Sequence, residues 1–302
     1  MTTTPIGTDA ERTLQLAERV VGTPLRTRKR PSFIIFLSYL LLSLGSVVMV
    51  VPFLWMILTS LKPAPELVQF SFLPKNPTLD NYVAVLTTSS FGRWYFNSLL
   101  IATISTTSVA FFDSLVGYTL NKFEFPGKNL IFMGILATLM IPTEMLIIPW
   151  FTMSVHFHWN VGVWQYWGIV FPGVITAVGI FLMRQFFDGV PDELLDAARI
   201  DGLNEFGIWW RIAMPLVKPA IAALCIFNFI GNWNAYLWPL IVASGRAYYT
   251  LPVGLSFFRG ESTTQWEKIM TGASLATVPL LIVFILFQRQ IIKGIALTGI
   301  KG

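Results

Sequence analysis

A charged segment interrupts the apolar part of the chain at residues 191–219, which read Pro-Asp-Glu-Leu-Leu-Asp-Ala-Ala-Arg-Ile-Asp-Gly-Leu-Asn-Glu-Phe-Gly-Ile-Trp-Trp-Arg-Ile-Ala-Met-Pro-Leu-Val-Lys-Pro. It holds five acidic and three basic residues. Apolar runs long enough to cross a bilayer lie on both sides, and charged side chains are costly in the hydrocarbon core. The segment is therefore expected to lie in water at a membrane surface.

Two short helices separated by a sharp turn are predicted within this segment. Pro191 suits the first turn of a helix, and the two acids that follow it favour the positive end of the helix dipole. Gly202 can adopt the left-handed conformation that ends a helix. Residues 203–213 have the composition of a second short helix, which Pro215 is expected to close.

The spacing of particular residues in this segment resembles a known signature. Asp196-Ala197-Ala198 is followed by three residues, Gly202, nine residues, Ile212, one residue and Met214-Pro215. This resembles the cytoplasmic loop of ABC importer permeases, Glu-Ala-Ala, three residues, Gly, nine residues, Ile, one residue, Leu-Pro. Asp stands here for Glu and Met for Leu, both similar in kind.

The resemblance implies that the first short helix is a coupling helix, which docks in a groove of an ATP-hydrolysing subunit. The small side chains of Ala197 and Ala198 would let the partner's backbone approach, and Asp196 would offer a carboxylate to a cationic group. Gly202 would set the angle between the helices. The alternative is an acidic amphipathic helix without a partner. The expected ATPase-coupling residues are Asp196, Ala197, Ala198, Asp201, Gly202, Ile212 and Pro215.

Composition places the chain among polytopic membrane proteins. Of 302 residues, 54% are hydrophobic and 12% charged, and the mean hydropathy is +0.64. Soluble domains carry about twice that share of charge. The net charge of +5 does not indicate nucleic-acid binding, because the bases are spread among loops. The single cysteine, Cys225, cannot form an intrachain disulfide.

Six membrane spans are predicted, in an all-α fold. Residues 1–30 form a polar cytoplasmic tail without a signal-peptide stretch, and residues 31–302 form the transmembrane permease domain. With both ends inside, fifteen of the 21 Lys and Arg residues fall on the cytoplasmic side, in agreement with the positive-inside rule. The predicted spans are residues 31–61, 94–121, 129–153, 166–187, 219–245 and 269–288.

Other motifs narrow the resemblance to carbohydrate-uptake permeases, specifically to the second membrane subunit of maltose-type importers. They are Phe123-Glu124-Phe125-Pro126-Gly127, Gly231-Asn232-Trp233-Asn234 and Phe287-Gln288-Arg289. This resemblance implies a type I ABC importer permease in a prokaryotic cytoplasmic membrane. Its partners would be a second permease, two nucleotide-binding subunits that hold ATP and Mg, and an extracytoplasmic solute-binding protein. No cofactor is expected in this chain.

A polar series in the fifth predicted span is a candidate translocation pathway. Amide and hydroxyl groups are costly inside a membrane unless they are bonded to a helix, to water or to a polar solute. A sugar-conducting cavity would need such groups beside aromatic rings. The alternative is that the asparagines join helices together. The candidate residues are Asn228, Asn232, Trp233, Asn234 and Tyr236.

Isolated ionisable residues leave more than one interpretation open. Asp113 lies within the second predicted span, where an acid marks either a function or a bond to Ser or Thr of a neighbouring helix. Glu144 is expected near the outer interface. His156 and His158 have no nearby Cys or Asp partners, so no metal site is predicted.

The carboxyl terminus also carries two interpretations. Gly299, Ile300, Lys301 and Gly302 would either form a solvated tail or, as the resemblance implies, contact the ATPase pair.

The sequence favours transport over catalysis. No phosphate-binding loop occurs, so the chain is not expected to be the ATPase. A membrane enzyme would need paired acids, a Ser/His pair or a metal cluster on facing spans. The resemblance implies half of the translocation pore of an ATP-driven importer for a di- or oligosaccharide. The alternatives are an importer of a polar solute such as glycerol phosphate and an ion-coupled secondary transporter, although no internal repeat is evident.

Overall fold

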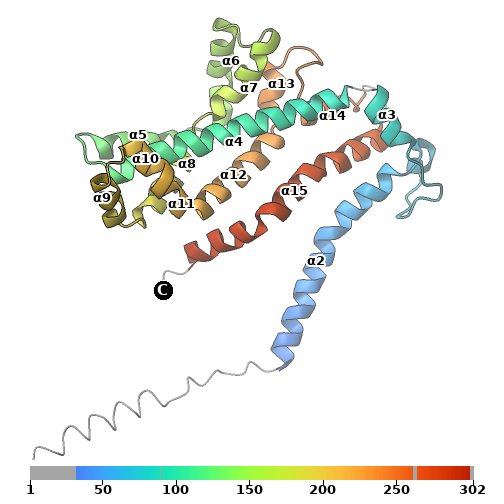
Figure 1. Ribbon diagram of the computed structural model, residues 1–302. Helices are drawn as coiled ribbons and strands as arrows, with labels where there is room; N and C mark the ends of the chain where they lie inside the picture. Colours follow the sequence, from blue (N-terminus) through green and yellow to red (C-terminus); the bar gives the residue numbers. More distant parts are fainter. Residues whose placement is uncertain (1–31, 89, 261–263, 300–302) are drawn as a thin grey trace, which may run out of the picture. The chain divides into compact units, whose positions relative to one another are not determined.

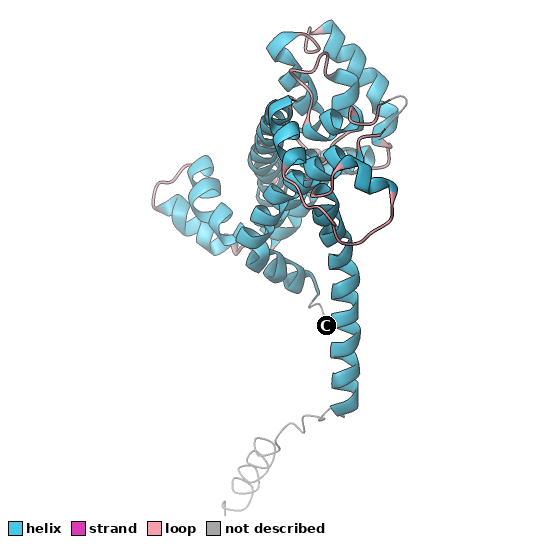
Figure 2. Cartoon of the chain, turned by 90° about the vertical axis from the view of Figure 1, so that its right-hand side faces the viewer, coloured by secondary structure: helices cyan, strands magenta, loops and turns pink. Residues whose placement is uncertain are grey.

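The computed structural model describes residues 32–88, 90–260 and 264–299, with side chains up to residue 288. These residues form helices joined by short loops and contain no strand (Figure 2). The chain divides into two compact units, Met1–Pro52 and Phe53–Gly302. The predicted tail, residues 1–30, lies outside the described residues.

The first predicted span is the apolar helix α2, Ser32–Ser60, with Pro52 inside it. The described part of the first unit is the portion of α2 up to Pro52. Two more helices in the second unit are long and apolar enough to cross a membrane, Phe91–Lys122 and Trp266–Gln288. All three fall where the sequence predicts spans.

The second unit is built around α4, which packs against both α8 and α12, while α15 packs against α12 (Figure 1). Their bounds are Phe91–Lys122 for α4, Ala177–Asp188 for α8, Lys218–Trp233 for α12 and Trp266–Gly299 for α15. Because α4 contacts both α8 and α12, its residues are placed to bond in two directions.

Three other apolar segments are bent pairs of helices. The first two fall where the sequence predicts the continuous third and fourth spans, and the last joins the end of the charged segment to the fifth predicted span. The pairs are Lys128–Thr138 with Thr143–His156, Gly162–Gly173 with Ala177–Asp188, and Glu205–Leu216 with Lys218–Trp233, bent by 92°, 51° and 85°. Counting each pair as one span gives up to six. The first break falls at Pro142, whose ring disfavours the helical conformation in the preceding residue.

The fifth predicted span is also shorter than expected. Helix α12 ends at Trp233, with Asn234 at its carboxyl end, and a separate helix α13, Leu237–Val242, follows. The prediction of one span through residue 245 is therefore wrong. Pro239 lacks an N–H and is tolerated near the start of α13, where no intrahelical bond is lost.

The remaining helices are short and connect these longer ones. They are η1 Ala64–Val68, α3 Asp80–Thr88, α5 Lys128–Thr138, η2 Thr143–Leu146, α6 Ile147–His156, η3 Gly162–Trp164, α7 Gln165–Val170, η4 Phe171–Gly173 and α14 Leu251–Ser256.

The charged segment folds into four consecutive helical pieces. They are α9 Asp192–Ile200, α10 Glu205–Ile208, a π-helical turn η5 Trp209–Ala213 and α11 Met214–Leu216. Pro215 does not close the second helix as predicted, since it occupies the first turn of α11. A proline cannot donate to the fourth residue before it, and the wider π turn comes immediately before α11. The chain bends instead at Val217.

Candidate functional site

Helix α9 ends in the sharp turn that the sequence predicts. Gly202 has φ +84°. Its N–H donates to the Arg199 carbonyl at 3.0 Å, and the Leu203 N–H donates to the Ala198 carbonyl at 3.1 Å. These two bonds define a Schellman motif, in which glycine avoids the cost of the left-handed conformation. We call residues 192–216 the elbow.

The next helix of the elbow starts at a side-chain cap. Asn204 accepts the N–H of Gly207 at 2.8 Å through Oδ1. This bond satisfies one of the free donors of the first turn of α10. The turn between α9 and α10 is therefore fixed at both of its ends by local bonds.

The two faces of α9 differ in what they contact. Leu195 and Ala198 are buried in a core cluster with Tyr118 of α4 and Phe187 of α8. Ala198 is 5% exposed, so its small size serves packing within this chain, and the expectation that it faces a partner is not supported. The other face is free in the part of the chain described. It presents Ala197, Asp196, Leu194, Asp201 and Ile200, which is 87% exposed.

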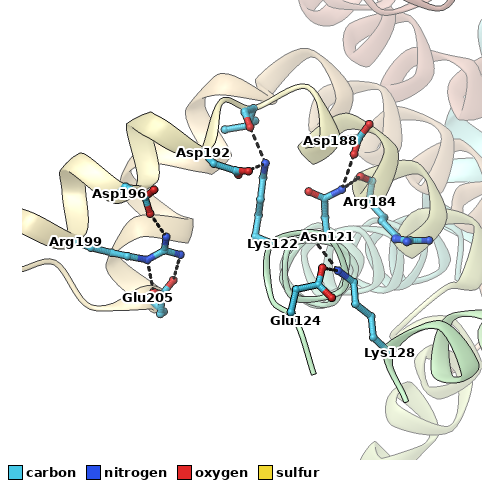
Figure 3. Close-up of polar contacts among 11 residues, drawn as sticks. Asn121, Lys122, Glu124, Lys128, Arg184, Asp188, Asp192, Asp196, Arg199 and Glu205 are labelled. Carbon is cyan, nitrogen blue, oxygen red and sulfur yellow. Dashed lines mark hydrogen bonds and ion pairs between the residues drawn. The ribbon is translucent and has the colours of Figure 1, made fainter. Parts of the chain in front are cut away.

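Asp196 is engaged within the elbow. Its Oδ1 accepts Nη1 of Arg199 at 2.5 Å, and Nε of the same guanidinium donates to Glu205 at 2.7 Å (Figure 3). These bonds raise the pKa of Arg199 further above its ordinary value. The Asp196 carboxylate is thus already paired with a cation of its own chain, and Arg199 ties α9 to α10 across the turn.

Of the other predicted coupling residues, Ile212 is half-buried against the same core cluster and Pro215 is exposed. Both lie in the part of the elbow that follows the turn, Ile212 in η5 and Pro215 in α11.

A second set of polar bonds joins the elbow to the membrane helices (Figure 3). Nζ of Lys122, in the last turn of α4, donates to the Val190 carbonyl at 2.6 Å and to Asp192 Oδ1 at 2.7 Å. Lys122 is 6% exposed and Asp192 72%. The ammonium group holds the pKa of Asp192 below its ordinary value. We call Lys122, Val190 and Asp192 the corner junction.

The candidate pathway residue Asn228 bonds to a neighbouring helix. Its Oδ1 accepts the Thr106 hydroxyl of α4 at 3.3 Å and Nδ2 of Asn232 at 2.9 Å. The Ser105 hydroxyl, at 3.5 Å, also donates to the Gly173 carbonyl at 3.1 Å. These contacts are those of asparagines that join helices, although both amides remain half-buried.

The other candidate pathway residues have different surroundings. Trp233 is 2% exposed, stacks on Phe229 and donates Nε1 to the Ala276 carbonyl, so its ring belongs to the core. Asn234 bonds only to Ile230 of its own helix, and Tyr236 is 43% exposed. The sequence analysis treated these residues as one pathway, but in the structure their side chains have different surroundings.

Asp113 makes the structural contact that the sequence left open. Its carboxylate is 0% exposed and accepts both the N–H and the hydroxyl of Thr176, at 2.9 and 2.5 Å. Thr176 is the amino-terminal cap of α8.

The remaining predicted residues form no site among the described residues. Glu144 lies in η2, and among the described residues no group of His, Cys, Asp and Glu could hold a metal ion. Gly299 ends α15, while Ile300, Lys301 and Gly302 lie outside the described residues.

Three residues that position the elbow were absent from the predicted site: Lys122, Arg199 and Asn204. Asn204 had a readable signal, because Asn immediately before an acidic first turn is typical of a helix start. Arg199 follows Asp196 by three residues, a spacing that favours an ion pair on one helix face. Lys122 had none, because its partners are 68 and 70 residues away.

These features define a class of protein: a helical membrane protein in which a charged pair of short helices, joined by a sharp turn, lies between apolar helices. Residues 113–296 match the family model described as "Binding-protein-dependent transport system inner membrane component". The chain belongs to this family. It is a membrane permease component of a transport system, and this confirms the predictions of a permease and of a chain that is not an enzyme.

Two relatives and one solved structure agree with this assignment. The chain is 35% identical to the arabinooligosaccharides transport system permease protein AraQ of Bacillus subtilis, over 91% of this chain and 99% of the relative. It is 38% identical to the sn-glycerol-3-phosphate transport system permease protein UgpE of Yersinia enterocolitica, over 68% and 73%. A bacterial ABC transporter that imports alginate has a chain of the same fold, with TM-score 0.76 and 23% identity over 88% of this chain and 99% of that chain.

Proposed function

We propose that the chain is one of two permease subunits of an ATP-driven ABC importer for an oligosaccharide, and that it forms half of the translocation pathway. The observation that carries the proposal is the 35% identity over nearly the full length of both this chain and AraQ, whose name gives arabinooligosaccharides as its solute. Two nucleotide-binding subunits would bind ATP and Mg, and an extracytoplasmic binding protein would deliver the solute.

The proposal includes six spans with both termini in the cytoplasm. Three long helices and two bent pairs are available for five crossings, and α12, the second helix of the third pair, for the sixth, because Glu205–Leu216 belongs to the elbow. The excess of Lys and Arg in the segments then placed inside supports this orientation. It puts the elbow in the cytoplasm, where the exposed face of α9 with Ala197 and Ile200 would meet a nucleotide-binding subunit.

The mechanism proposed is alternating access. Closure of the ATPase pair would draw the elbows of the two permeases together, and rocking of the spans would turn the cavity outward. Asn228, Asn232, Asn234 and Tyr236 remain candidates for the pathway, and the residues from Gly299 onward remain candidates for an ATPase contact. Trp233 is excluded from the proposed lining because its ring is buried.

The decisive experiment is uptake by proteoliposomes that contain the whole complex with its binding protein. We expect ATP-dependent uptake of a labelled arabino-oligosaccharide. We also expect Gly202→Val, or Asp196→Lys, to abolish uptake and binding-protein-stimulated ATP hydrolysis while the complex stays inserted. Normal transport by either variant would contradict the role given to the elbow.

A second solute class is favoured by a specific observation, the 38% identity to UgpE. Labelled glycerol 3-phosphate in the same proteoliposomes distinguishes the two. Uptake that depends on an ion gradient and persists without ATP would instead indicate a secondary transporter.

A further inference from the structure

The elbow is attached to the membrane helices in two different ways at its two ends. At the α9 end, the corner junction supplies an ion pair and a bond to a backbone carbonyl, both from a lysine that is 6% exposed. Such a buried ammonium group is held in one position, because leaving it unpaired would be costly. The geometry of the corner therefore depends on Lys122.

The last turn of α4 is fastened to α8 as well as to α9. Nε of Arg184 donates to the Leu120 carbonyl at 3.2 Å. Nδ2 of Asn121 donates to the Arg184 carbonyl at 3.1 Å and to Asp188 at 3.3 Å (Figure 3). Three consecutive residues of α4 thus bond to α8 or to the corner that follows it. The end of α4, the end of α8 and the start of α9 form one bonded block.

The α12 end of the elbow lacks equivalent bonds. In the part of the chain that the structure describes, no ion pair joins α10, η5 or α11 to a membrane helix. The buried indole N–H of Trp209 has no partner there. A π-helical turn and an 85° bend separate this arm from α12. Against the membrane helices this arm presents buried apolar side chains, Ile208, Trp209 and Ala213, and apolar contacts are not directional.

We propose that Lys122 is a positioning residue that makes α9 move as one body with α4 and α8. Displacement of α9 by a docked partner then reaches the α4 span directly through the corner junction and not by way of α12. This inference rests on the proposed coupling function of the elbow, and it names the residue through which that coupling enters the membrane.

Substitution of Lys122 separates this role from a purely structural one. Lys122→Met keeps much of the side-chain volume and removes the buried ammonium group, and the carboxylate left without its partner, Asp192, is 72% exposed and stays solvated. In the reconstituted complex we expect uptake to fall about tenfold, a change of the size that coupling between two sites typically produces. ATP hydrolysis stimulated by the binding protein should persist. Lys122→Arg, which keeps the charge, should restore most of the uptake.

The matched control is Lys128→Met. Lys128 pairs with Glu124 and donates to the Asn121 carbonyl, but it does not touch α9. We expect the Lys128→Met variant to take up solute at the wild-type rate. Wild-type uptake by Lys122→Met would overturn the inference, and so would uptake and ATP hydrolysis that fall together in proportion to the amount of folded protein.

A reversible cross-link tests the movement itself. Lys122 and Asp192 both line an open cavity of about 510 Å³, so a water-soluble reagent can reach them. With Cys225 changed to Ser, Lys122→Cys and Asp192→Cys can be joined by a short bis-methanethiosulfonate. We expect the cross-link to restore the uptake lost in the double variant and reduction to remove it again. If the cross-linked complex stays inactive, α9 and α4 do not move together, and the inference is overturned.

The proposed function fails in a different way. In that case the unmodified complex itself would show no ATP-driven uptake, or Gly202→Val would transport normally. Failure of the inference alone leaves the unmodified complex active and sensitive to Gly202→Val, with Lys122→Met equally active.

Discussion

Asp113 of α4 holds Thr176, the last residue of the break before α8, through both of its carboxylate oxygens. The Thr176 hydroxyl in turn accepts the N–H of Gly179 at 3.0 Å, which caps α8. An acid buried within a membrane span is therefore used to fix a bend in the neighbouring helix. The break leaves backbone N–H groups without acceptors in a helix. The Asp113 carboxylate supplies the missing acceptor for the N–H of Thr176.

Asp113→Ala is expected to destabilise the protein by about 1–3 kcal/mol, because it leaves the N–H and hydroxyl of Thr176 without their acceptor. Asp113→Asn should cost less, since its amide oxygen can still accept one of the two bonds. Thermal unfolding in detergent measures both. Thr107→Ala is the control, because exposed Thr107 bonds only to Thr103 of its own helix. Equal effects of all three variants would contradict this account.

Gly179→Ala tests the close approach of α4 to α8. A methyl group at Gly179 would lie 1.9 Å from Oδ2 of Asp113 and 2.7 Å from Oγ1 of Thr176, so the buried cap must shift. We expect loss of folded protein or destabilisation by roughly 1–3 kcal/mol. Gly231→Ala in α12 meets nothing within 4 Å and should be neutral or slightly stabilising. A ranking in the opposite order would show that α4 and α8 are further apart.

The stability of variants at Gly202 should depend on how readily the new residue adopts a positive φ, and not on the size of its side chain. No atom lies within 4 Å of a methyl group built there, yet φ is +84°. We expect Gly202→Asn to be the mildest change, Gly202→Ala intermediate and Gly202→Val the worst, with a strain of about 1–2 kcal/mol for Ala. Thermal midpoints of the purified variants give this order. If Val and Asn were equivalent, the turn would not need the left-handed conformation.

Asn228 can be assigned to packing or to the pathway by comparison with Asn234. Asn228→Ala removes the acceptor of Thr106 and Asn232, and should destabilise the protein by about 1 kcal/mol. Asn234→Ala removes only a bond within its own helix and should not. Paired measurements of thermal stability and of the solute concentration for half-maximal uptake decide the matter. A change in the latter with unchanged stability would identify Asn228 as a pathway residue.

The bond between Lys122 and Asp192 predicts a pH dependence. The pKa of Asp192 is lowered in the folded protein, so its contribution to stability is complete above the ordinary pKa of an unfolded aspartate. That contribution is lost as the pH falls through the lowered value. The stability difference between the wild type and Asp192→Asn should be constant near neutral pH and vanish in acid. A difference that instead grows toward low pH would have the wrong sign, and Asp201→Asn serves as the comparison.

The sequence predicted well wherever the signal is local. Helices α2, α4 and α15 follow from long apolar runs, in which Asp113 of α4 is an isolated acid. The turn at Gly202 was predictable because a helix often ends at a residue with a positive φ, and glycine adopts that conformation most readily. The breaks in three spans were missed because an apolar run has the same composition whether it is straight or bent. Pro142 marks the place of a break, but the 92° angle is set where α5 packs against α8 and α6 against α13.

By itself, the sequence determined that the chain is a helical membrane protein, where the charged elbow starts and turns, and to which family its spacing belongs, because these depend on residues within one helix or turn. Only the tertiary structure decided that Ala198 packs inward, that Asp113 holds the capping residue of α8, that Trp233 lies in the core and that Lys122 fastens α9 to α4. Such pairs lie tens of residues apart, and hydrogen bonding and burial exist for them only after the helices have packed.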